Sequence, residues 1–329
     1  MSGHMGDARL SDPAAFGRVC VLMGGWSTER EVSLWSGQAV LAALRERGVD
    51  AHAVDPDRER LFGLKREGFD RAFNVMHGTV GEDGTLQAVL ELIGLRCTGS
   101  GVLASALAMD KLRSKRMWRA EGLPTPDYFP VSSPAEVRAA ADRLGYPFIL
   151  KPSEEGSSVG VTKVKSADQI AAAFALARGD SGRAVMAERF ISCGAPHPEF
   201  TCAILGRQVL PTVRIEPDGE FYDYRAKYLS SDTRYACPSG LPDALETRVR
   251  DMCLQAFDLL GARGWGRIDF LLDERGEPWL LEANLVPGMT SHSLMPMAAR
   301  AAGIDFAELV WRILEDTLDP PQSRREETA

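Results

Sequence analysis

Three side chains that carry oxygen ligands stand in two short segments of the sequence. Asp269 lies in "GRIDFLL", and Glu282 and Asn284 lie in "PWLLEAN". Residues two apart in a β-strand face the same side, so Glu282 and Asn284 share a face if their segment is a strand. The short connection "DERGE" predicts a hairpin that brings Asp269 to the same place. Two carboxylates and an amide oxygen are ligands that Mg²⁺ takes, with water and phosphate oxygens completing six. We therefore predict a metal site; the alternative is a half-exposed strand edge that runs into a turn.

Two neighbouring features favour the metal site. Arg267 precedes Asp269 by two residues, so both side chains face the same side, where a guanidinium would meet phosphates. The Pro287-Gly288 break ends the second segment and redirects the chain, so that "TSHSLMPMAARAAG" can begin a helix whose N-terminus faces the site. Backbone amides at this N-terminus, together with the Ser293 hydroxyl, predict a pocket for a carboxylate.

The loop "KPSEEGSSVGV" predicts a phosphate-binding segment. Lys151 closes a strand, and Gly156, Ser157, Ser158 and Gly160 follow before the next strand begins. Such a loop can fold backbone N–H groups and hydroxyls over phosphates, with the lysine neutralising charge. The pattern GxxxxGK[ST] is absent, so this is not a P-loop. The alternative is a flexible hairpin turn.

Two loops near the start of the chain follow predicted parallel strands. In "GGWSTEREVS", Thr28 and Glu31 fit a capping box, and Glu29 could face a cation such as a substrate ammonium. In "VMHGTVGEDGT", His77 ends another strand at the same sheet edge. A helix-terminus carboxylate without a ligand and a structural histidine are the alternatives. The first loop does not complete GxGxxG, which argues against a dinucleotide site.

The elements that must position these residues predict an α/β protein, with α+β character in the C-terminal half. Strands and helices alternate in the first third, which implies a parallel sheet wrapped by helices. We expect one helix through "SALAMDKLRSKRMWRAEG" and one helix in the middle section, at "SADQIAAAFALARG". The predicted divisions are a disordered N-terminal extension (1–16), an N-terminal α/β domain (17–110), a central domain (111–198), a C-terminal domain (199–318) and a tail (319–329).

The composition is that of an ordinary globular enzyme. The chain has 329 residues, of which 45% are hydrophobic and 26% charged, and this excludes disordered and fibrous classes. Its net charge of -8 argues against nucleic-acid binding, which requires a basic face. No apolar segment approaches the roughly 18 to 20 residues of a membrane helix, and the polar N-terminus lacks a secretory signal. The six scattered cysteines form no CxxC pair. We therefore expect a cytoplasmic protein without membrane partners.

The combination of a glycine-rich loop after a lysine, a distant Asp…Glu-x-Asn hairpin and no P-loop resembles the ATP-grasp superfamily. Specific strings resemble the D-alanine–D-alanine ligase family, occur in its order, and span most of the chain from Gly24 to Ala299. They are "GGWSTEREVSLWSG", "HGTVGEDGTLQ", "TGSGVLASALAMDKLRSK", "KPSEEGSSVG", "YDYRAKYLS", "GWGRIDFLL" and "LLEANLVPGMTSHSLMPMAA". The resemblance implies an ATP-grasp fold, with the first domain for substrate and the next two as ATP-grasp subdomains.

This resemblance implies ATP as a substrate and assigns residues to each part of it. Two lysines match the family's phosphate ligands, Glu188 matches the residue that meets the adenine amine, and Glu199 matches the ribose ligand. The implied ATP-binding residues are Lys111, Lys151, Ser157, Ser158, Glu188, Ile191, Glu199, Tyr222 and Lys227. The implied metals are two Mg²⁺ (or Mn²⁺) ions on Asp269, Glu282 and Asn284.

The resemblance also implies D-alanine as substrate and a set of catalytic residues. Glu29 would meet the ammonium of the first D-alanine with His77 nearby, and Ser293 with the Leu294 amide would take the carboxylate of the second. Arg267 and the Gly288 backbone would flank the reacting carbon. Lys227 and Tyr228 would lie on a lid, with Tyr228 linked to Ser157 and Glu29. The implied catalytic residues are Glu29, Ser157, Tyr228, Arg267 and Gly288.

The implied reaction is ATP-dependent ligation of two D-alanine molecules through an acyl phosphate, for peptidoglycan precursors. The family also implies a homodimer. Arg189 departs from the family's usual lysine, and extra residues precede Glu199, so the ribose side departs most. A D-alanine–D-lactate ligase or another carboxylate–amine ligase is the alternative, which Tyr228 argues against because D-lactate ligases in the family typically carry phenylalanine there. A dinucleotide-dependent oxidoreductase would leave the metal hairpin unexplained.

Overall fold

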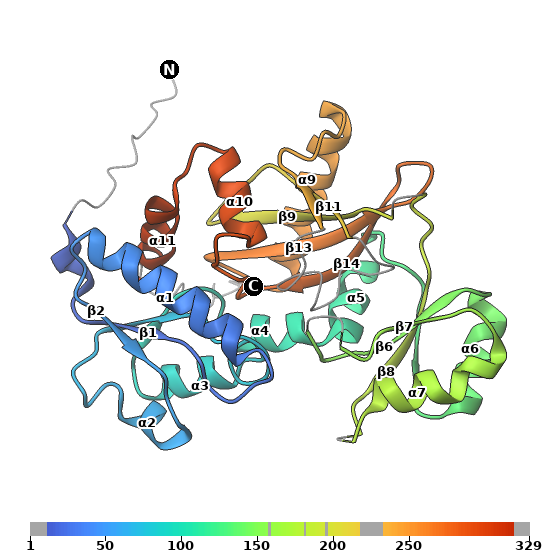
Figure 1. Cartoon of the computed structure of the whole chain (residues 1–329), viewed down its shortest axis with the longest axis horizontal. Helices are drawn as coiled ribbons and strands as arrows, with labels where there is room; N and C mark the ends of the chain where they lie inside the picture. The colour runs from blue at the N-terminus through green and yellow to red at the C-terminus, as the bar shows by residue number, and fades with distance from the viewer. Residues whose placement is uncertain (1–11, 157–158, 181, 195–196, 218–232, 319–329) are drawn as a thin grey trace, which may run out of the picture.

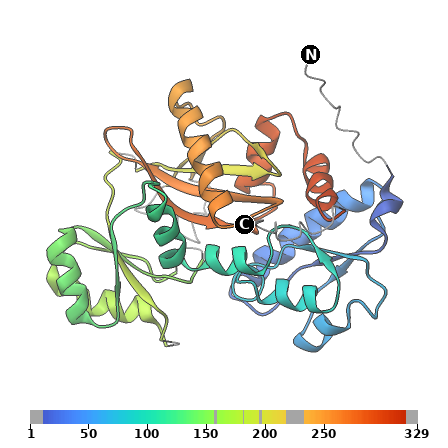
Figure 2. The same cartoon turned by 180° about the vertical axis from the view of Figure 1, so that it is seen from behind.

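The computed structural model describes residues 12–156, 159–180, 182–194, 197–217 and 233–318. Within these residues the chain forms three sheets with helices packed around them (Figure 1). In both views, the first and second sheets lie at opposite ends of the long axis, and the third lies between them (Figure 2). None of the helices in the described parts of the chain has the length and apolar character that a membrane span requires.

The first sheet is parallel, with the strand order β2-β1-β3-β4. Its central strand β1 reads VCVL and is buried throughout, as expected for a strand that is covered on both faces. The predicted α/β alternation is therefore confirmed. The strands are β1 (Val19–Leu22), β2 (Ala51–Val54), β3 (Arg71–Asn74) and β4 (Arg96–Cys97), and the helices are α1 (Arg30–Glu46), α2 (Arg58–Gly63) and α3 (Thr85–Leu92).

The second sheet is antiparallel, with the order β5-β8-β6-β7. The expectation of a single helix in this section was wrong. Ser133 caps a further helix by accepting a hydrogen bond from the Glu136 N–H, and Pro134 occupies the first turn. The strands are β5 (Tyr128–Val131), β6 (Phe148–Pro152), β7 (Thr162–Val164) and β8 (Val185–Arg189), and the helices are α6 (Pro134–Leu144), the 3₁₀ turn η2 (Ala167–Gln169) and α7 (Ile170–Arg178).

The third sheet is also antiparallel, with the order β12-β11-β9-β13-β14 and β10 paired to β9. This is the α+β character that the sequence predicts for the C-terminal half. The strands are β9 (Glu199–Leu205), β10 (Gln208–Val209), β11 (Val213–Glu216), β12 (Arg234–Ala236), β13 (Trp265–Leu272) and β14 (Pro278–Asn284), and the helices are α9 (Asp243–Leu259), α10 (Leu294–Ala301) and α11 (Phe306–Glu315).

The helix that was predicted through "SALAMDKLRSKRMWRAEG" is two helices, α4 (Val102–Met109) and α5 (Lys111–Ala120). Asp110 separates them: its backbone is extended, and its side chain accepts a hydrogen bond from the Arg113 N–H. An aspartate at this position caps the second helix and ends the first. The break directs the start of α5, and with it Lys111, toward the loop after β6, where the Lys111 N–H donates to the Ser153 carbonyl.

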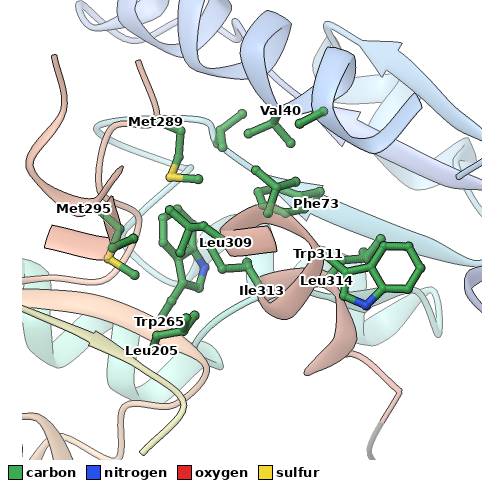
Figure 3. Packing of buried hydrophobic residues seen from close by; sticks show 14 of the residues in the cluster. Val40, Phe73, Leu205, Trp265, Met289, Met295, Leu309, Trp311, Ile313 and Leu314 are labelled. Atoms are coloured by element: carbon green, nitrogen blue, oxygen red, sulfur yellow. The ribbon is translucent and has the colours of Figure 1, made fainter. Parts of the chain in front are cut away.

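One hydrophobic core joins the first and third sheets. Figure 3 shows Val40 and Phe73 packed against residues of the C-terminal half, and the Phe73 and Trp265 rings lie 6.2 Å apart. The predicted disorder of residues 1–16 was wrong for the described part of that range, because Pro13–Phe16 forms the 3₁₀ turn η1 and Phe16 packs edge-on against Trp311. The first and third sheets are therefore packed together, and loops from both can contribute to one site.

Candidate active site

The carboxylates predicted to bind metal face each other across the β13–β14 hairpin. Asp269 pairs directly with Glu282, and Arg267 pairs with Asn284. Directly opposed residues of an antiparallel pair lie on the same face with their Cβ atoms about 5 Å apart. The predicted hairpin is confirmed, and its two strands bring all four side chains to one face.

A β-bulge lies beside the carboxylate pair. Phe270 pairs with Leu280, whereas Asp269 pairs with Glu282, so Leu281 is an extra residue. A bulge of this kind lets two successive side chains face the same side. Leu281 and Glu282 do so: both are half-buried and both line the same cavity, whereas Leu280 is fully buried in the core.

Cations and a hydroxyl surround the two carboxylates. The Arg267 guanidinium lies 3.3 Å from Asp269, and the Lys111 ammonium lies 3.1 Å from Glu282. The Thr201 hydroxyl, on β9, donates to Asp269 at 2.5 Å. Two carboxylates held this close repel one another unless cations neutralise them. In this structure the neutralising groups are the arginine and lysine that the sequence predicts to face phosphates.

Two cavities meet at Glu282. The first has about 930 Å³ of empty space and a largely polar lining, and the second has about 980 Å³ and a more apolar lining. Lys111, Glu155 and Glu282 line both cavities. A molecule in one cavity would therefore reach a molecule in the other at the carboxylate pair.

The first cavity contains the start of helix α10. Ser293 is its N-cap residue, and the Ser293 hydroxyl accepts a hydrogen bond from the Thr290 N–H at 2.9 Å. A Cβ atom at Gly288 would lie only 2.9 Å from the Ser293 hydroxyl oxygen, so a side chain there would displace the serine. Leu294 is the first residue of the helix and also lines the cavity. This is the helix N-terminus that the sequence predicts as an anion pocket.

Glu29 also lines the first cavity, but its local structure differs from the prediction. Helix α1 starts at Arg30 with Glu29 as the N-cap residue and without a side-chain cap bond, so the Thr28–Glu31 capping box was wrong. The Ser27 hydroxyl accepts the Glu29 N–H instead. Cβ atoms placed on Gly78 and Gly156 would lie 3.1 and 3.3 Å from the Glu29 carboxylate. The loop after β6 and the loop after β3 thus both approach Glu29.

His77 is held by a chain of hydrogen bonds that runs between the first and third sheets. Its Nδ1 lies 3.2 Å from Glu82, and its Nε2 lies 3.4 Å from the Ser36 hydroxyl. The Ser36 oxygen accepts the Met289 N–H at 3.0 Å. An amide N–H can only donate and an ionised carboxylate can only accept. With Glu82 ionised, the His77 Nδ1 carries a proton and donates it to the Glu82 carboxylate.

Burial raises the pKa of Glu82, and the neighbouring Glu29 carboxylate raises it further, although the hydrogen bond from His77 opposes both effects. Burial disfavours the charged form of a carboxyl group, and so does a second negative charge. Glu82 lines the first cavity together with His77 and Glu29.

The second cavity has apolar walls around one buried carboxylate. Ile149, Ile191, Ile215 and Leu281 are among the wall residues, and Glu188 is 2% exposed. Such a space fits a flat aromatic ring that carries a hydrogen-bond donor at one edge.

Two lysines contact the buried Glu188 carboxylate. The Lys115 ammonium lies 2.7 Å from one oxygen, and the Lys151 ammonium lies 2.6 Å from the other. Burial alone would raise the pKa of Glu188, but the two lysines together outweigh burial and hold the pKa below its ordinary value. Burial lowers the pKa of Lys115 to about 8, against the opposing effect of Glu188.

The ribose side of the second cavity carries the extra residues noted in the sequence. Glu199 begins β9 and lines the cavity. His197, from the extra residues, lines it too, and its Nε2 lies 2.8 Å from the Ile191 carbonyl. Arg189, which replaces the family's usual lysine, is half-exposed beside Asp127 at 3.9 Å.

The two cavities gather all of the predicted site residues that the structure describes. Those in the first cavity alone are Glu29, His77, Arg267, Asn284, Gly288, Ser293 and Leu294. Those in the second alone are Lys151, Glu188, Ile191, Glu199 and Asp269, and Lys111 and Glu282 line both. Ser157, Ser158, Tyr222, Lys227 and Tyr228 lie outside the described residues.

Sequence reasoning missed several residues of this site, among them the polar residues Ser36, Glu82, Lys115 and Thr201. Lys115 had a usable signal, because it follows Lys111 by four residues and therefore shares its helix face. Glu82 follows His77 in the same glycine-rich loop, where a second carboxylate could have been considered. Ser36 and Thr201 had no local signal.

Comparisons with known proteins agree with this geometry. Residues 117–315 match a family model described as D-ala D-ala ligase C-terminus. The chain is 54% identical over 300 residues to D-alanine–D-alanine ligase B of Chromobacterium violaceum, which covers 91% of this chain and 97% of the relative. It is 53% identical over 300 residues to the D-alanine–D-alanine ligase of Laribacter hongkongensis, covering 91% and 96%.

Solved structures show the same fold. The D-alanine–D-alanine ligase of Bacillus anthracis complexed with ATP superposes with a TM-score of 0.78 at 30% identity, covering 92% of this chain and 97% of that one. The VanG D-Ala:D-Ser ligase of Enterococcus faecalis also gives 0.78, at 28% identity, covering 91% and 99%. The predicted ATP-grasp fold is thereby confirmed. With the family model and relatives at this identity over nearly the whole chain, the protein belongs to the D-alanine–D-alanine ligase family.

Proposed function

We propose that this protein joins two D-alanine molecules into D-alanyl-D-alanine with hydrolysis of ATP to ADP and phosphate, in the cytoplasm, as a step of peptidoglycan precursor synthesis. The observation that carries the proposal is the Asp269–Glu282 pair at the junction of the two cavities. A phosphoryl transfer needs its donor and acceptor on either side of such a charged centre.

The second cavity would hold ATP. Its apolar walls suit the adenine ring, and the buried Glu188 carboxylate would accept a hydrogen bond from the adenine amine. Lys111, at the junction, and Lys151, which also lines this cavity, would neutralise the phosphates. The Ile191 backbone would meet the ring, and Glu199 would bind the ribose.

Asp269, Glu282 and Asn284 would hold two Mg²⁺ (or Mn²⁺) ions. The donor set fits a hard cation: it has two opposed carboxylates and an amide oxygen, which accepts the Val286 N–H and retains a second lone pair. No cluster of three acidic, histidine or cysteine side chains occurs within the described ranges, so phosphate oxygens and water would complete the coordination. When bound, such ions would withdraw charge from the transferring phosphoryl group.

The first cavity would hold the two D-alanine molecules. The Glu29 carboxylate would pair with the ammonium of the first, beside His77. The Ser293 hydroxyl and the Leu294 N–H, at the start of α10, would bind the carboxylate of the second. Both amino acids would then lie between Glu29 and the anion pocket, next to the carboxylate pair.

The reaction would proceed in two steps. A carboxylate oxygen of the first D-alanine attacks the γ-phosphorus of ATP, forming an acyl phosphate as the bond to ADP breaks. The neutral amine of the second D-alanine then attacks the acyl carbon, and phosphate leaves as the C–N bond forms. Arg267 and the Gly288 N–H would stabilise the oxyanion, each donor contributing about 3 kcal/mol. Ser157, Lys227 and Tyr228 would close over the site and exclude water, which would otherwise hydrolyse the acyl phosphate.

The proposal is tested by incubating the protein with ATP, Mg²⁺ and D-alanine, measuring ADP release and identifying the product by mass. We expect the dipeptide with D-alanine and no dipeptide with L-alanine. D-Lactate and D-serine, each supplied with D-alanine at neutral pH, test the second substrate. Preferential formation of the ester with D-lactate would contradict the amine specificity, and ADP release without any dipeptide would contradict ligation.

We further propose that the protein is a homodimer, which analytical ultracentrifugation would test.

A further inference from the structure

Lys115 is a buried cation to which neither the family resemblance nor the proposed mechanism gives a role. Among the described residues it is the only charged side chain with 0% exposure. Its ammonium has three partners: Glu188 at 2.7 Å, the Thr125 hydroxyl at 2.8 Å and the Leu280 carbonyl at 3.1 Å. The contacts with Thr125 and Leu280 are hydrogen bonds, and the contact with Glu188 is an ion pair. Lys115 lines neither of the two cavities and is therefore not placed to contact a substrate directly.

Lys151 contacts the other oxygen of the Glu188 carboxylate. Unlike Lys115, Lys151 lines the second cavity. If Lys151 turns toward the phosphates when ATP binds, Lys115 is the remaining cation that contacts Glu188. A buried carboxylate without a nearby cation takes up a proton, since burial disfavours the charged form. Burial lowers the pKa of Lys115, and the Glu188 carboxylate opposes this shift because it favours the charged ammonium.

The protonation state of Glu188 determines which purine it can bind. An ionised carboxylate only accepts hydrogen bonds and so pairs with a 6-amino group, whereas a protonated carboxyl group can also donate to a 6-oxo group. We propose that Lys115 is a positioning residue for nucleobase selection: it keeps Glu188 ionised and oriented when ATP binds, so that the cavity prefers a 6-aminopurine to a 6-oxopurine. This inference rests on the proposed function, because it takes ATP as the nucleotide.

The same lysine fixes the strand beside the metal residues. The Leu280 carbonyl accepts hydrogen bonds from both Lys115 and Thr125, and Leu280 is the last regularly paired residue before the bulge at Leu281. One buried ammonium thus contacts both Glu188 and the backbone of Leu280, the residue before the wall residue Leu281. Lys115 would therefore position both the carboxylate that meets the adenine amine and the strand that carries one wall of the nucleotide cavity.

The test compares ATP with inosine triphosphate, which carries a 6-oxo group. Values of kcat/KM for each nucleotide, and KM for D-alanine, are measured in the wild type, Lys115→Met, Lys111→Met and the exposed-site control Lys65→Met. We expect the preference for ATP to fall about tenfold in K115M, the scale of a hydrogen bond to a charged group, with KM for D-alanine unchanged. K111M should lower kcat/KM for both nucleotides alike, because Lys111 would contact the phosphates that the two nucleotides share. K65M should match the wild type.

The proposal would be overturned if a folded K115M kept the wild-type preference for ATP. It would also be overturned if kcat/KM fell equally for ATP and for inosine triphosphate. The double variant Lys115→Met/Glu188→Gln covers the case in which K115M does not fold, because it removes the buried carboxylate together with its cation. It should show the same loss of preference, and wild-type selectivity in it would also overturn the inference. Calorimetry of the binding of each nucleotide separates this failure from a failure of the proposed function. If the wild type forms no dipeptide, the proposed function is contradicted. The difference in nucleotide binding preference between the wild type and K115M still tests the role of Lys115.

Discussion

The Ser36 hydroxyl accepts the Met289 N–H at 3.0 Å, and this contact joins helix α1 to the segment that follows Gly288. Both residues are buried, and they stand 253 positions apart in the sequence. The hydrogen bond fixes the plane of the Gly288–Met289 peptide and ties it to His77. Ser36, on α1, thus holds the peptide that directly follows the Gly288 N–H, the group that would stabilise the oxyanion.

Ser36→Ala should therefore reduce turnover while preserving the fold. Without the hydroxyl, the Met289 N–H loses this hydrogen bond and the Gly288–Met289 peptide can rotate. That rotation would shift the adjoining Gly288 N–H, and we expect kcat to fall about tenfold. The measurement is steady-state dipeptide formation with thermal unfolding alongside. Ser105→Ala is the matched control, because Ser105 is also buried and its hydroxyl has no hydrogen-bond partner among the residues that the structure describes. Equal loss of activity in both variants would show that Ser36 acts only through packing.

Glu282→Gln should abolish ligation and leave the fold intact. The change removes one of two opposed carboxylates but keeps the size of the side chain, and we expect at least a hundredfold loss of ADP release with Mg²⁺, because several kcal/mol of charge stabilisation are lost. Near-normal turnover would show that the metal assignment is wrong. Glu277→Gln is the control on the same hairpin: Glu277 is exposed and pairs with Arg248, and its loss should leave both turnover and stability close to those of the wild type.

Much of the carboxylate site could be predicted because its information is local. Alternation along a strand and a five-residue connection were sufficient to bring Asp269 opposite Glu282. Strand–helix alternation likewise predicted the parallel sheet. The bulge could not be predicted, because the alternation rule assumes a regular strand and gives no sign that Leu281 and Glu282 face the same cavity.

The buried polar network was beyond sequence reasoning for a different reason. Lys115 contacts the Leu280 carbonyl 165 positions away, and no pattern in either segment indicates the other. Helix boundaries failed where one capping residue competes with propensity, as at Asp110, which divides a continuous helical pattern into α4 and α5. The division into three domains stays a prediction.

Glu82→Gln should make the protein more stable at neutral pH and less active. Burial and the nearby Glu29 raise the pKa of Glu82 in the folded state, so the folded protein binds more protons than the unfolded chain above the ordinary glutamate pKa. The free energy of unfolding therefore falls as pH rises from the unfolded-state pKa of Glu82 to its raised folded-state pKa. Above the folded-state pKa, the loss of stability is complete. The glutamine variant lacks this cost, so its stability relative to the wild type should increase from about pH 4 to neutral pH. Denaturant unfolding across that range measures the difference.

The activity of the same variant should change in the opposite direction. An ionised carboxylate can only accept from His77, whereas an amide can also donate and permit the other tautomer. We expect kcat/KM for D-alanine to fall about tenfold. A stability difference that decreased with pH, or activity equal to the wild type, would contradict the role given to Glu82.

Leu280 and Leu281 are neighbours whose loss should have opposite consequences, because the bulge turns one into the core and the other toward the second cavity. Leu280 is 0% exposed, so Leu280→Ala should destabilise the fold by about 2–5 kcal/mol. Leu281 is half-buried, and Leu281→Ala should change stability much less while removing a wall of the nucleotide cavity. Apolar contact does not distinguish a 6-amino from a 6-oxo group, so KM for ATP and for inosine triphosphate should rise together, each about tenfold. Thermal unfolding and steady-state kinetics on both variants measure this. If L281A instead lost stability as L280A does, with unchanged nucleotide KM, the side chain of Leu281 would belong to the core and the bulge would have no part in nucleotide binding.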